Sequence, residues 1–132
     1  DDMDVVLAGM NDVVNHPRGT AFRSRIWVDG KTMAGKTGTV QVRTISEAER
    51  SDRVLPNSEL PWHLRDHAIF VGYAPVDNPR YAVAVLVEHG GGGSTVAAPI
   101  GNKILTAALE QEPIMASKPS TPKLQTQSNG AS

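Results

Sequence analysis

The first apolar pattern along the chain is typical of an amphipathic helix. Apolar residues recur at spacings of three and four, which places them on one stripe of a helical surface: Met3, Val6, Leu7, Met10 and Val14. Asp1, Asp2 and Asp4 suit the positive end of that helix. Pro17 lacks a backbone donor and restricts the residue before it, so we predict a helix over residues 3–15.

The next segment has the alternating pattern of β-strands. Residues 22–28 alternate in a strand-like way, and residues 33–45 carry β-branched residues with a period of two. Asp29 and Gly30 lie between the two runs and favour a tight turn. The pattern therefore predicts a first β-hairpin.

A second hairpin is predicted after a long connection. Residues 46–66 are charged, contain two prolines and show no sustained period, which indicates a surface loop with one short helical turn. Residues 67–74 and 81–87 are then almost continuously apolar and flank a turn at residues 77–79. Apolar runs of this kind are typical of strands that are buried on both faces.

The last predicted element is a second amphipathic helix. Residues 90–93 are glycines that end the preceding strand, and Ser94 or Thr95 is expected to cap the helix that follows. This helix ends before Pro113, and five residues form its apolar stripe: Ile100, Ile104, Leu105, Ala108 and Leu109. Residues 113–132 are rich in Pro, Ser, Thr and Gln, so we predict a disordered tail there.

The order of these elements predicts an α+β fold. Four antiparallel strands would form a sheet on which the two helices pack with their apolar stripes. A chain of 132 residues has room for one domain. We place the folded part at residues 1–112.

Composition excludes some partners without selecting one. Thirteen Lys and Arg residues balance 14 Asp and Glu residues, so no global field favours nucleic acid or an anionic membrane. Cysteine is absent, which excludes disulfides and thiolate chemistry. No apolar run approaches the roughly 18 residues that span a bilayer. The chain opens on Asp1 without an initiator methionine, so we expect a piece of a larger protein.

Residues 30–37 spell the pattern of a phosphate-binding loop: glycine, four residues, then glycine, lysine and threonine. That site needs a helix that begins at the lysine, because the free N–H groups of its first turn bind the phosphates. Residues 38–42 are a poor helix start. A nucleotide-binding function is therefore the least favoured alternative.

The same residues also fit a different chemistry. Lys36, Thr37 and Gly38 lie on a predicted strand and match the lysine-threonine-glycine element of penicillin-binding proteins and serine β-lactamases. Side chains alternate along a strand, so Thr37 and Thr39 share a face and can bind one carboxylate, while Lys36 adds positive charge. Gly38 lets a peptide lie against the strand edge, which leaves the Thr39 N–H for an oxyanion. An ordinary strand with an incidental tetrapeptide is the alternative.

A longer series of segments supports the second interpretation. Residues 33–42 and 65–75 resemble successive strands of the transpeptidase domain of class B penicillin-binding proteins. Three further segments continue the series in order: residues 17–21, 78–85 and 88–94. The last of these is similar to the elongation-type group, penicillin-binding protein 2, rather than to the division-type group. The resemblance covers about residues 3–110 and implies the C-terminal part of the serine transpeptidase/β-lactamase-like fold.

The resemblance also implies a reaction and a site. Class B enzymes are D,D-transpeptidases that cross-link peptidoglycan: a serine attacks the D-Ala-D-Ala bond of a stem peptide, and β-lactams imitate that substrate. By resemblance, Lys36, Thr37, Gly38 and Thr39 bind the substrate, and the Thr39 N–H forms part of the oxyanion hole. No cofactor and no metal are implied.

Expected partners follow from the same resemblance. They are stem peptides ending in D-Ala-D-Ala, β-lactams and the cell-elongation machinery, at the periplasmic face of the inner membrane with an anchor upstream of this chain; nucleic acid is not among them. A noncatalytic module that binds β-lactams or another protein is the alternative.

The nucleophile of the family is not found where it belongs. The serine-x-x-lysine and serine-x-asparagine elements precede the strand in the family, and neither is present there. Residues 120–123 and 128–130 contain similar letters, but they lie in the tail, where Pro122 disfavours the helix that the first element needs. The chain alone is therefore expected to be inactive.

Histidines and one tryptophan are the other candidates for chemistry. His63 and His67 lie four apart, but His67 begins a predicted strand and no third ligand is evident, so no metal site is predicted. Glu88, His89 and Ser94 lack the sharp strand-to-helix turn that a nucleophilic serine needs. Trp62 either covers the substrate groove or anchors its loop.

Overall fold

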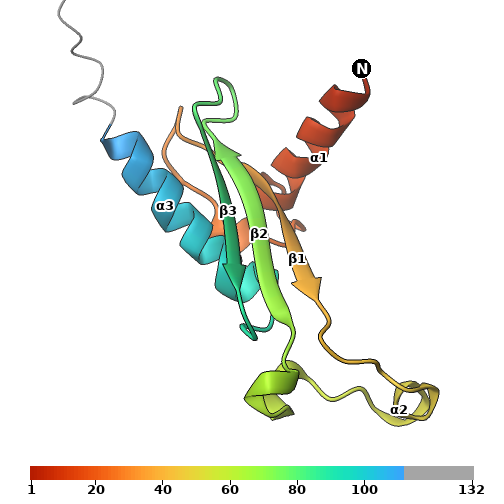
Figure 1. Cartoon of the computed structure of the whole chain (residues 1–132). Coiled ribbons are helices and arrows are strands. Elements are labelled where there is room, and N and C mark those ends of the chain that lie inside the picture. The colour runs from red at the N-terminus through yellow and green to blue at the C-terminus, as the bar shows by residue number, and fades with distance from the viewer. Residues whose placement is uncertain (112–132) are drawn as a thin grey trace, which may run out of the picture.

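The structure is a computed structural model that describes residues 1–111. Its helices and strands are α1 (Asp2–Asn15), β1 (Ala34–Val40), α2 (Glu47–Asp52), β2 (His67–Ala74), β3 (Tyr81–Val87) and α3 (Ala98–Glu110). The strands form one antiparallel sheet in the order β1-β2-β3. Figure 1 shows α3 lying along the sheet, while α1 begins at the N-terminus away from the sheet and ends beside β1. The tail predicted over residues 113–132 lies outside the described residues.

The predicted α+β fold is confirmed, and four of its elements match closely. The helix predicted over residues 3–15 is α1, whose N-cap Asp1 accepts a hydrogen bond from the Met3 N–H at 3.2 Å. The second hairpin is β2 and β3, which pair from Ala74 opposite Tyr81. The last predicted helix is α3. The strong periodicity of apolar residues predicted these elements from the sequence.

The core is organised around the ring of Phe70, which is fully buried in β2. Glycines on β1, β2 and α3 leave the space for this ring: a Cβ on Gly35, Gly72 or Gly101 would overlap with its carbon atoms. Because glycine lets the backbone approach closely, α3 can lie tightly against the sheet. Val85, Leu105 and other buried apolar side chains complete the cluster.

The first predicted hairpin is wrong in its first strand. Residues 22–24 form a 3-10 turn instead of a strand, and Asn102 of α3 donates to the carbonyls of Ser24 and Arg25 at 2.8 and 3.2 Å. Those carbonyls are therefore occupied by a helix side chain rather than by a strand partner. The predicted tight turn is present, since Gly30 has φ +73° and the Lys31 N–H donates to the Val28 carbonyl.

Arg25 stacks on two aromatic rings within residues 22–28. The Arg25 guanidinium lies 3.4 Å from the ring centroid of Phe22 and 3.3 Å from that of Trp27. The aromatic rings of this segment therefore contact a cation instead of facing a neighbouring strand. Desolvation lowers the pKa of Arg25, although an arginine stays charged at physiological pH.

Two smaller expectations are also corrected. Neither Ser94 nor Thr95 caps α3, because a π turn, η4 (Gly93–Ala97), leads directly into the helix and supplies its first backbone partners. Within residues 1–111, the strands β2 and β3 are covered on one face only: Val71 and Leu86 are 40% and 61% exposed on the other. The apolar runs nevertheless have the composition of strands with two covered faces.

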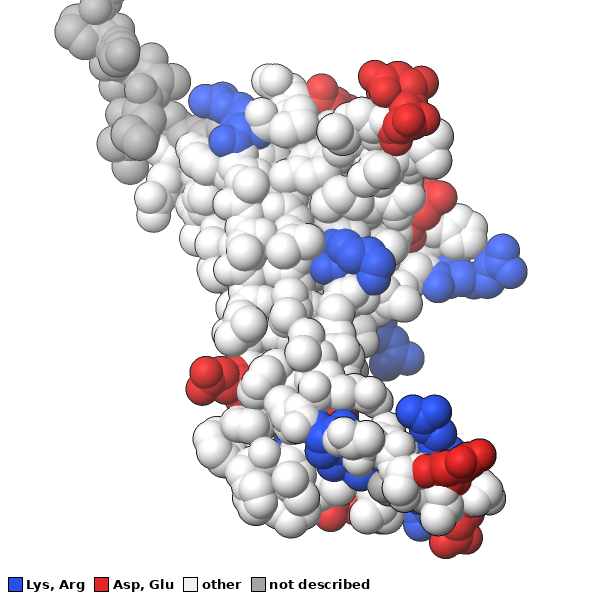
Figure 2. Space-filling view, turned by 45° about the vertical axis from the view of Figure 1, so that its right-hand side comes forward, with Lys and Arg blue, Asp and Glu red and all other residues white. Residues whose placement is uncertain are grey.

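The long β1–β2 connection forms a separate lobe at one end of the sheet (Figure 1). It contains α2 and two 3-10 turns, η2 (Asn57–Glu59) and η3 (Trp62–Leu64), so it is more helical than predicted. Asn57 ties the lobe to the sheet, because its side chain accepts from the Asp66 N–H at 2.8 Å and donates to the Asp66 carboxylate at 3.0 Å. Figure 2 shows charges of both signs on this lobe and acidic side chains where α1 begins.

Two helical glycines give a test of the packing around Phe70. Gly101→Ala is expected to destabilise the protein by about 1–3 kcal/mol, because the new methyl group overlaps with the ring. Gly9→Ala on α1 has nothing within 4 Å of its new methyl group, so it is expected to stabilise the helix by up to about 1 kcal/mol. Thermal unfolding measures both, and a rise in melting temperature for both variants would contradict this packing.

Candidate functional site

The candidate site residues lie together on the outer strand of the sheet. Lys36, Thr37, Gly38 and Thr39 are in the middle and second half of β1, which has β2 on one side only within the described residues. Their partners on β2 run from Val71 to Ala68. This placement excludes the phosphate-loop alternative, because Lys36 lies within a strand and no helix begins there.

The alternation of β1 gives the four residues two different directions. Thr37 and Thr39 point to the face that carries Phe70, while Lys36 and Gly38 point to the opposite face. Lys36 is exposed and has no carboxylate partner among residues 1–111. Two hydroxyls and an ammonium group are thus available along one short strand.

Backbone groups of β1 face the open edge of the sheet. The Thr37 carbonyl accepts a hydrogen bond from the Lys36 ammonium at 2.6 Å, so it is directed away from β2. Along an antiparallel ladder, residues whose N–H and C=O groups face the neighbouring strand alternate with residues whose groups face away. Thr39 lies two residues further on, and its N–H therefore also points to the open edge. A donor in that position can bind an oxyanion.

Thr20 is a further residue of the candidate site, although no sequence pattern predicted a role for it. Its hydroxyl lies 2.9 Å from the hydroxyl of Thr37. A hollow of about 290 Å³ adjoins Thr20 and is also lined by Arg23 and Ser94. Hydroxyls and a guanidinium are donors, so this hollow suits an anionic group. The only signal in the sequence was the resemblance of residues 17–21, which did not predict a contact across 17 residues.

A glycine supports β1 from behind. Gly93, at the start of η4, lies so close to the sheet that a Cβ would overlap with the carbonyl oxygens of Gly38 and Ile69. Gly38 itself has more room, since its own Cβ would meet Ile69 at an ordinary 3.5 Å. The backbone that carries the candidate site is therefore held by Gly93, while the other face of Gly38 can accept a ligand.

The histidines fall into two groups. His63 is exposed on η3, whereas His67 in β2 accepts a hydrogen bond from the His89 N–H at 2.9 Å. Trp62 lies with its ring 4.3 Å from that of His89, which favours the interpretation that it anchors its loop. Ser94 is not brought into a triad with His89, whose ring is bonded to the Arg65 carbonyl.

Residues 1–111 contain neither a cluster of metal ligands nor a membrane-spanning helix. No three side chains of His, Asp or Glu gather there as metal ligands would. No helix in this part of the chain is long and apolar enough to cross a bilayer. The groups that β1 offers for binding are hydroxyls, an ammonium group and backbone N–H groups.

The chain is similar in sequence to peptidoglycan transpeptidases. The profile of the penicillin binding protein transpeptidase domain matches residues 1–106. Peptidoglycan D,D-transpeptidase MrdA of Haemophilus influenzae is 40% identical over 104 residues, which are 78% of this chain and 15% of that protein. MrdA of Escherichia coli K12 is 36% identical over 88 residues, which are 67% of this chain and 13% of that protein.

Solved structures have the same fold. PBP2 of Pseudomonas aeruginosa, solved in complex with WCK 5153, is 37% identical, with a TM-score of 0.59 over 89% of this chain and 22% of that one. PBP2 of Helicobacter pylori, solved in complex with MreC, is 28% identical, with a TM-score of 0.61 over 86% of this chain and 17% of that one. This chain therefore spans less than a quarter of either structure.

Two glycines near the site are expected to respond differently to alanine. Gly93→Ala should lower the free energy of unfolding by about 1–3 kcal/mol, because its methyl group overlaps with the backbone of β1 and β2. Gly38→Ala should change the free energy of unfolding by less than about 1 kcal/mol, because its methyl group meets Ile69 at 3.5 Å. Urea unfolding measures both, and equal losses would show that Gly93 does not support β1.

Proposed function

We propose, since this chain belongs to the penicillin-binding protein transpeptidase domain family, that its full-length protein is a peptidoglycan D,D-transpeptidase of cell elongation. This chain supplies the strand that binds the terminal carboxylate of the stem peptide and the oxyanion of the reaction. The observation that carries the proposal is the open edge of β1, along which Lys36, Thr37 and Thr39 present their donors.

The reaction is an acyl transfer in two steps. A serine from the part of the protein upstream of this chain attacks the carbonyl carbon between the two D-alanines, and the terminal D-alanine leaves with a proton on its nitrogen. The amine of a neighbouring stem peptide then attacks the acyl-enzyme and releases the serine. Each step passes through a tetrahedral oxyanion, which a fixed N–H group stabilises.

Residues of β1 have separate tasks in both steps. Thr37 and Lys36 hold the terminal carboxylate with charge-assisted hydrogen bonds, which fixes the position of the scissile bond. The Thr39 N–H faces the oxyanion, and the loss of one such donor costs on the order of 3 kcal/mol of barrier stabilisation. Gly38 lets the peptide lie along the strand as an additional strand would.

Exposed apolar surface supports the proposal that more of the protein covers this chain. Met3 and Val6 on α1 are 60% and 56% exposed, although they continue the stripe that buries Val14. Leu86 is exposed on the uncovered face of the sheet. A stripe and a sheet face of this kind are normally covered in a folded domain. We assign that role to the upstream part of the domain, which also brings the serine to β1.

Location and partners are part of the same proposal. Stem peptides of peptidoglycan are the substrates, and β-lactams bind in their place. The full-length protein works at the periplasmic face of the inner membrane, with its anchor upstream. The cell-elongation machinery is its partner, an assignment supported by the complex of the Helicobacter pylori relative with MreC.

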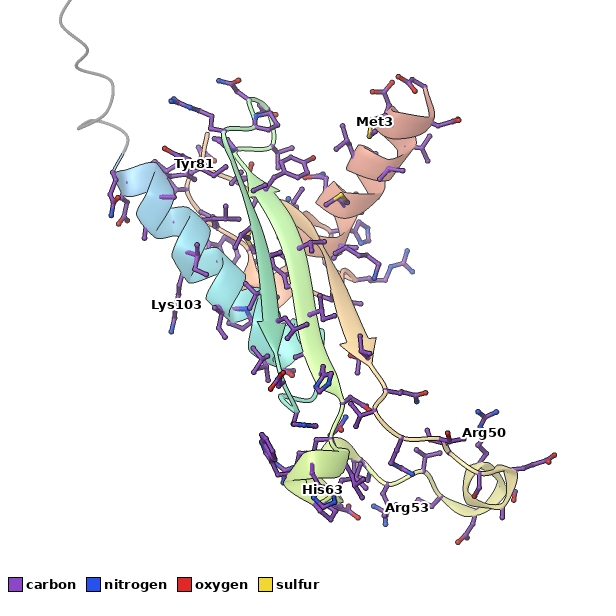
Figure 3. The ribbon with its side chains drawn as sticks, in the orientation of Figure 1. Met3, Arg50, Arg53, His63, Tyr81 and Lys103 are labelled. Carbon is purple, nitrogen blue, oxygen red and sulfur yellow. The ribbon has the colours of Figure 1, made fainter. Side chains whose placement is uncertain are left out.

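Labelling by a fluorescent penicillin tests the role of β1. In the full-length protein, Lys36→Ala and Thr37→Val are each expected to slow acylation about ten- to hundred-fold, because each removes a hydrogen bond to the carboxylate. Lys103→Ala is the matched control: Lys103 is exposed on α3 and points away from the sheet (Figure 3). Its acylation rate should equal that of the wild type.

Wild-type rates in both β1 variants would refute the carboxylate-binding role. A wild-type protein that is labelled but forms no cross-links from stem peptides would identify a noncatalytic β-lactam-binding module. A wild-type protein that is not labelled at all would refute the transpeptidase proposal.

A further inference from the structure

A short segment after β3 is tied to the segment before β2. The His89 N–H donates to Nδ1 of His67 at 2.9 Å, and the Gly91 N–H donates to the Asp66 carbonyl at 2.9 Å. The His89 ring binds the Arg65 carbonyl at 2.9 Å through its Nδ1. Three hydrogen bonds thus connect residues 89–91 with residues 65–67, which are more than 20 positions away in the chain.

His89 holds an unusual conformation at this junction. Its φ is +52°, in the left-handed region that a non-glycine residue rarely adopts. Two rings lie against its own: that of Trp62 at 4.3 Å and that of His67 at 4.7 Å between centroids. A strained backbone of this kind persists only where the surroundings hold it. The rings and hydrogen bonds around His89 supply that restraint.

The restrained segment leads directly to the glycine that supports the site. Gly93 follows His89 by four residues and lies against the backbone of Gly38 and Ile69. We propose that His67 and His89 are positioning residues that form a histidine latch, which holds Gly93 against β1 and thereby fixes the Thr39 N–H in the oxyanion hole. The role of Thr39 rests on the proposed function, whereas the latch itself is independent of it.

The two histidines have opposite roles in these hydrogen bonds. A carbonyl only accepts hydrogen bonds, so Nδ1 of His89 carries a hydrogen toward the Arg65 carbonyl. Nδ1 of His67 accepts from the His89 N–H and carries no hydrogen. The latch therefore needs an acceptor on residue 67 and a donor on residue 89.

Other charged groups lie in the segments around the latch. Arg65 and Asp66 precede β2, Glu88 follows β3 directly before His89, and His63 lies on η3. Arg65 Nε donates to the Leu60 carbonyl at 3.0 Å, and the Asp66 carboxylate accepts from Asn57. His63 is the matched control for His67, because it lies only four residues before it in the chain and is exposed.

Amide hydrogen exchange in the full-length protein tests the latch directly. His67→Leu removes the acceptor, so exchange in residues 88–97 and 36–40 is expected to become about three- to ten-fold faster. His67→Asn places an oxygen acceptor near the position of Nδ1 and should retain slow exchange. His63→Asn should exchange as the wild type does. Unchanged exchange in His67→Leu would overturn the latch, whatever the enzyme's activity.

Penicillin labelling tests the link to the site. His67→Leu should be acylated about three- to ten-fold more slowly than the wild type, and His67→Asn should restore most of the rate. His63→Asn should be acylated at the wild-type rate.

The outcomes separate the two proposals. Faster exchange without slower labelling in His67→Leu would show that the latch closes but does not position Thr39, which overturns the positioning role. A wild-type protein that is never labelled would refute the transpeptidase proposal, while the exchange data would still decide whether the latch exists.

Discussion

The antiparallel ladder between β1 and β2 determines the geometry of the whole candidate site. Its register, with Gly38 opposite Ile69, places the two threonines on one face of β1 and the lysine on the other. The same ladder uses the backbone groups of alternate residues, which leaves those of Thr37 and Thr39 at the open edge. A slip of one residue would exchange the two faces and turn the N–H groups of Thr37 and Thr39 toward β2. The arrangement of the candidate site therefore depends on register more than on any single side chain.

Close packing on the other side of the sheet maintains that register. Phe70 fills the space left by glycines on three elements, and Gly93 lies directly behind Gly38. Contacts of this kind tolerate no added methyl group, so the position of β1 is coupled to α3 and to the segment after β3. The histidine latch extends the coupling to the β1–β2 connection. Elements far apart in the sequence thus converge on the backbone of one short strand.

The local pattern of apolar residues predicted most elements of the fold, but it did not predict the contacts between residues that are distant in the sequence. The stripe of α1 and the apolar runs of β2 and β3 predicted their elements because burial imposes a period on the sequence. Residues 22–28 also alternate, but Arg25 stacks on two rings and Asn102 binds the carbonyls, which only the tertiary structure reveals. For the same reason, the contacts of Thr20 with Thr37 and of His67 with His89 were not predicted. The candidate site on β1 could be predicted from the sequence because its four residues are consecutive.

The central claim is that the open edge of β1 binds the carboxylate and the oxyanion of an acyl-enzyme. A crystal structure of the full-length protein acylated by a β-lactam tests it most directly. The account predicts the ligand carboxylate within hydrogen-bonding distance of Thr37 and Lys36, and its ester carbonyl oxygen about 2.7–3.1 Å from the Thr39 nitrogen. A ligand bound elsewhere, or another strand paired along this edge of β1, would contradict it.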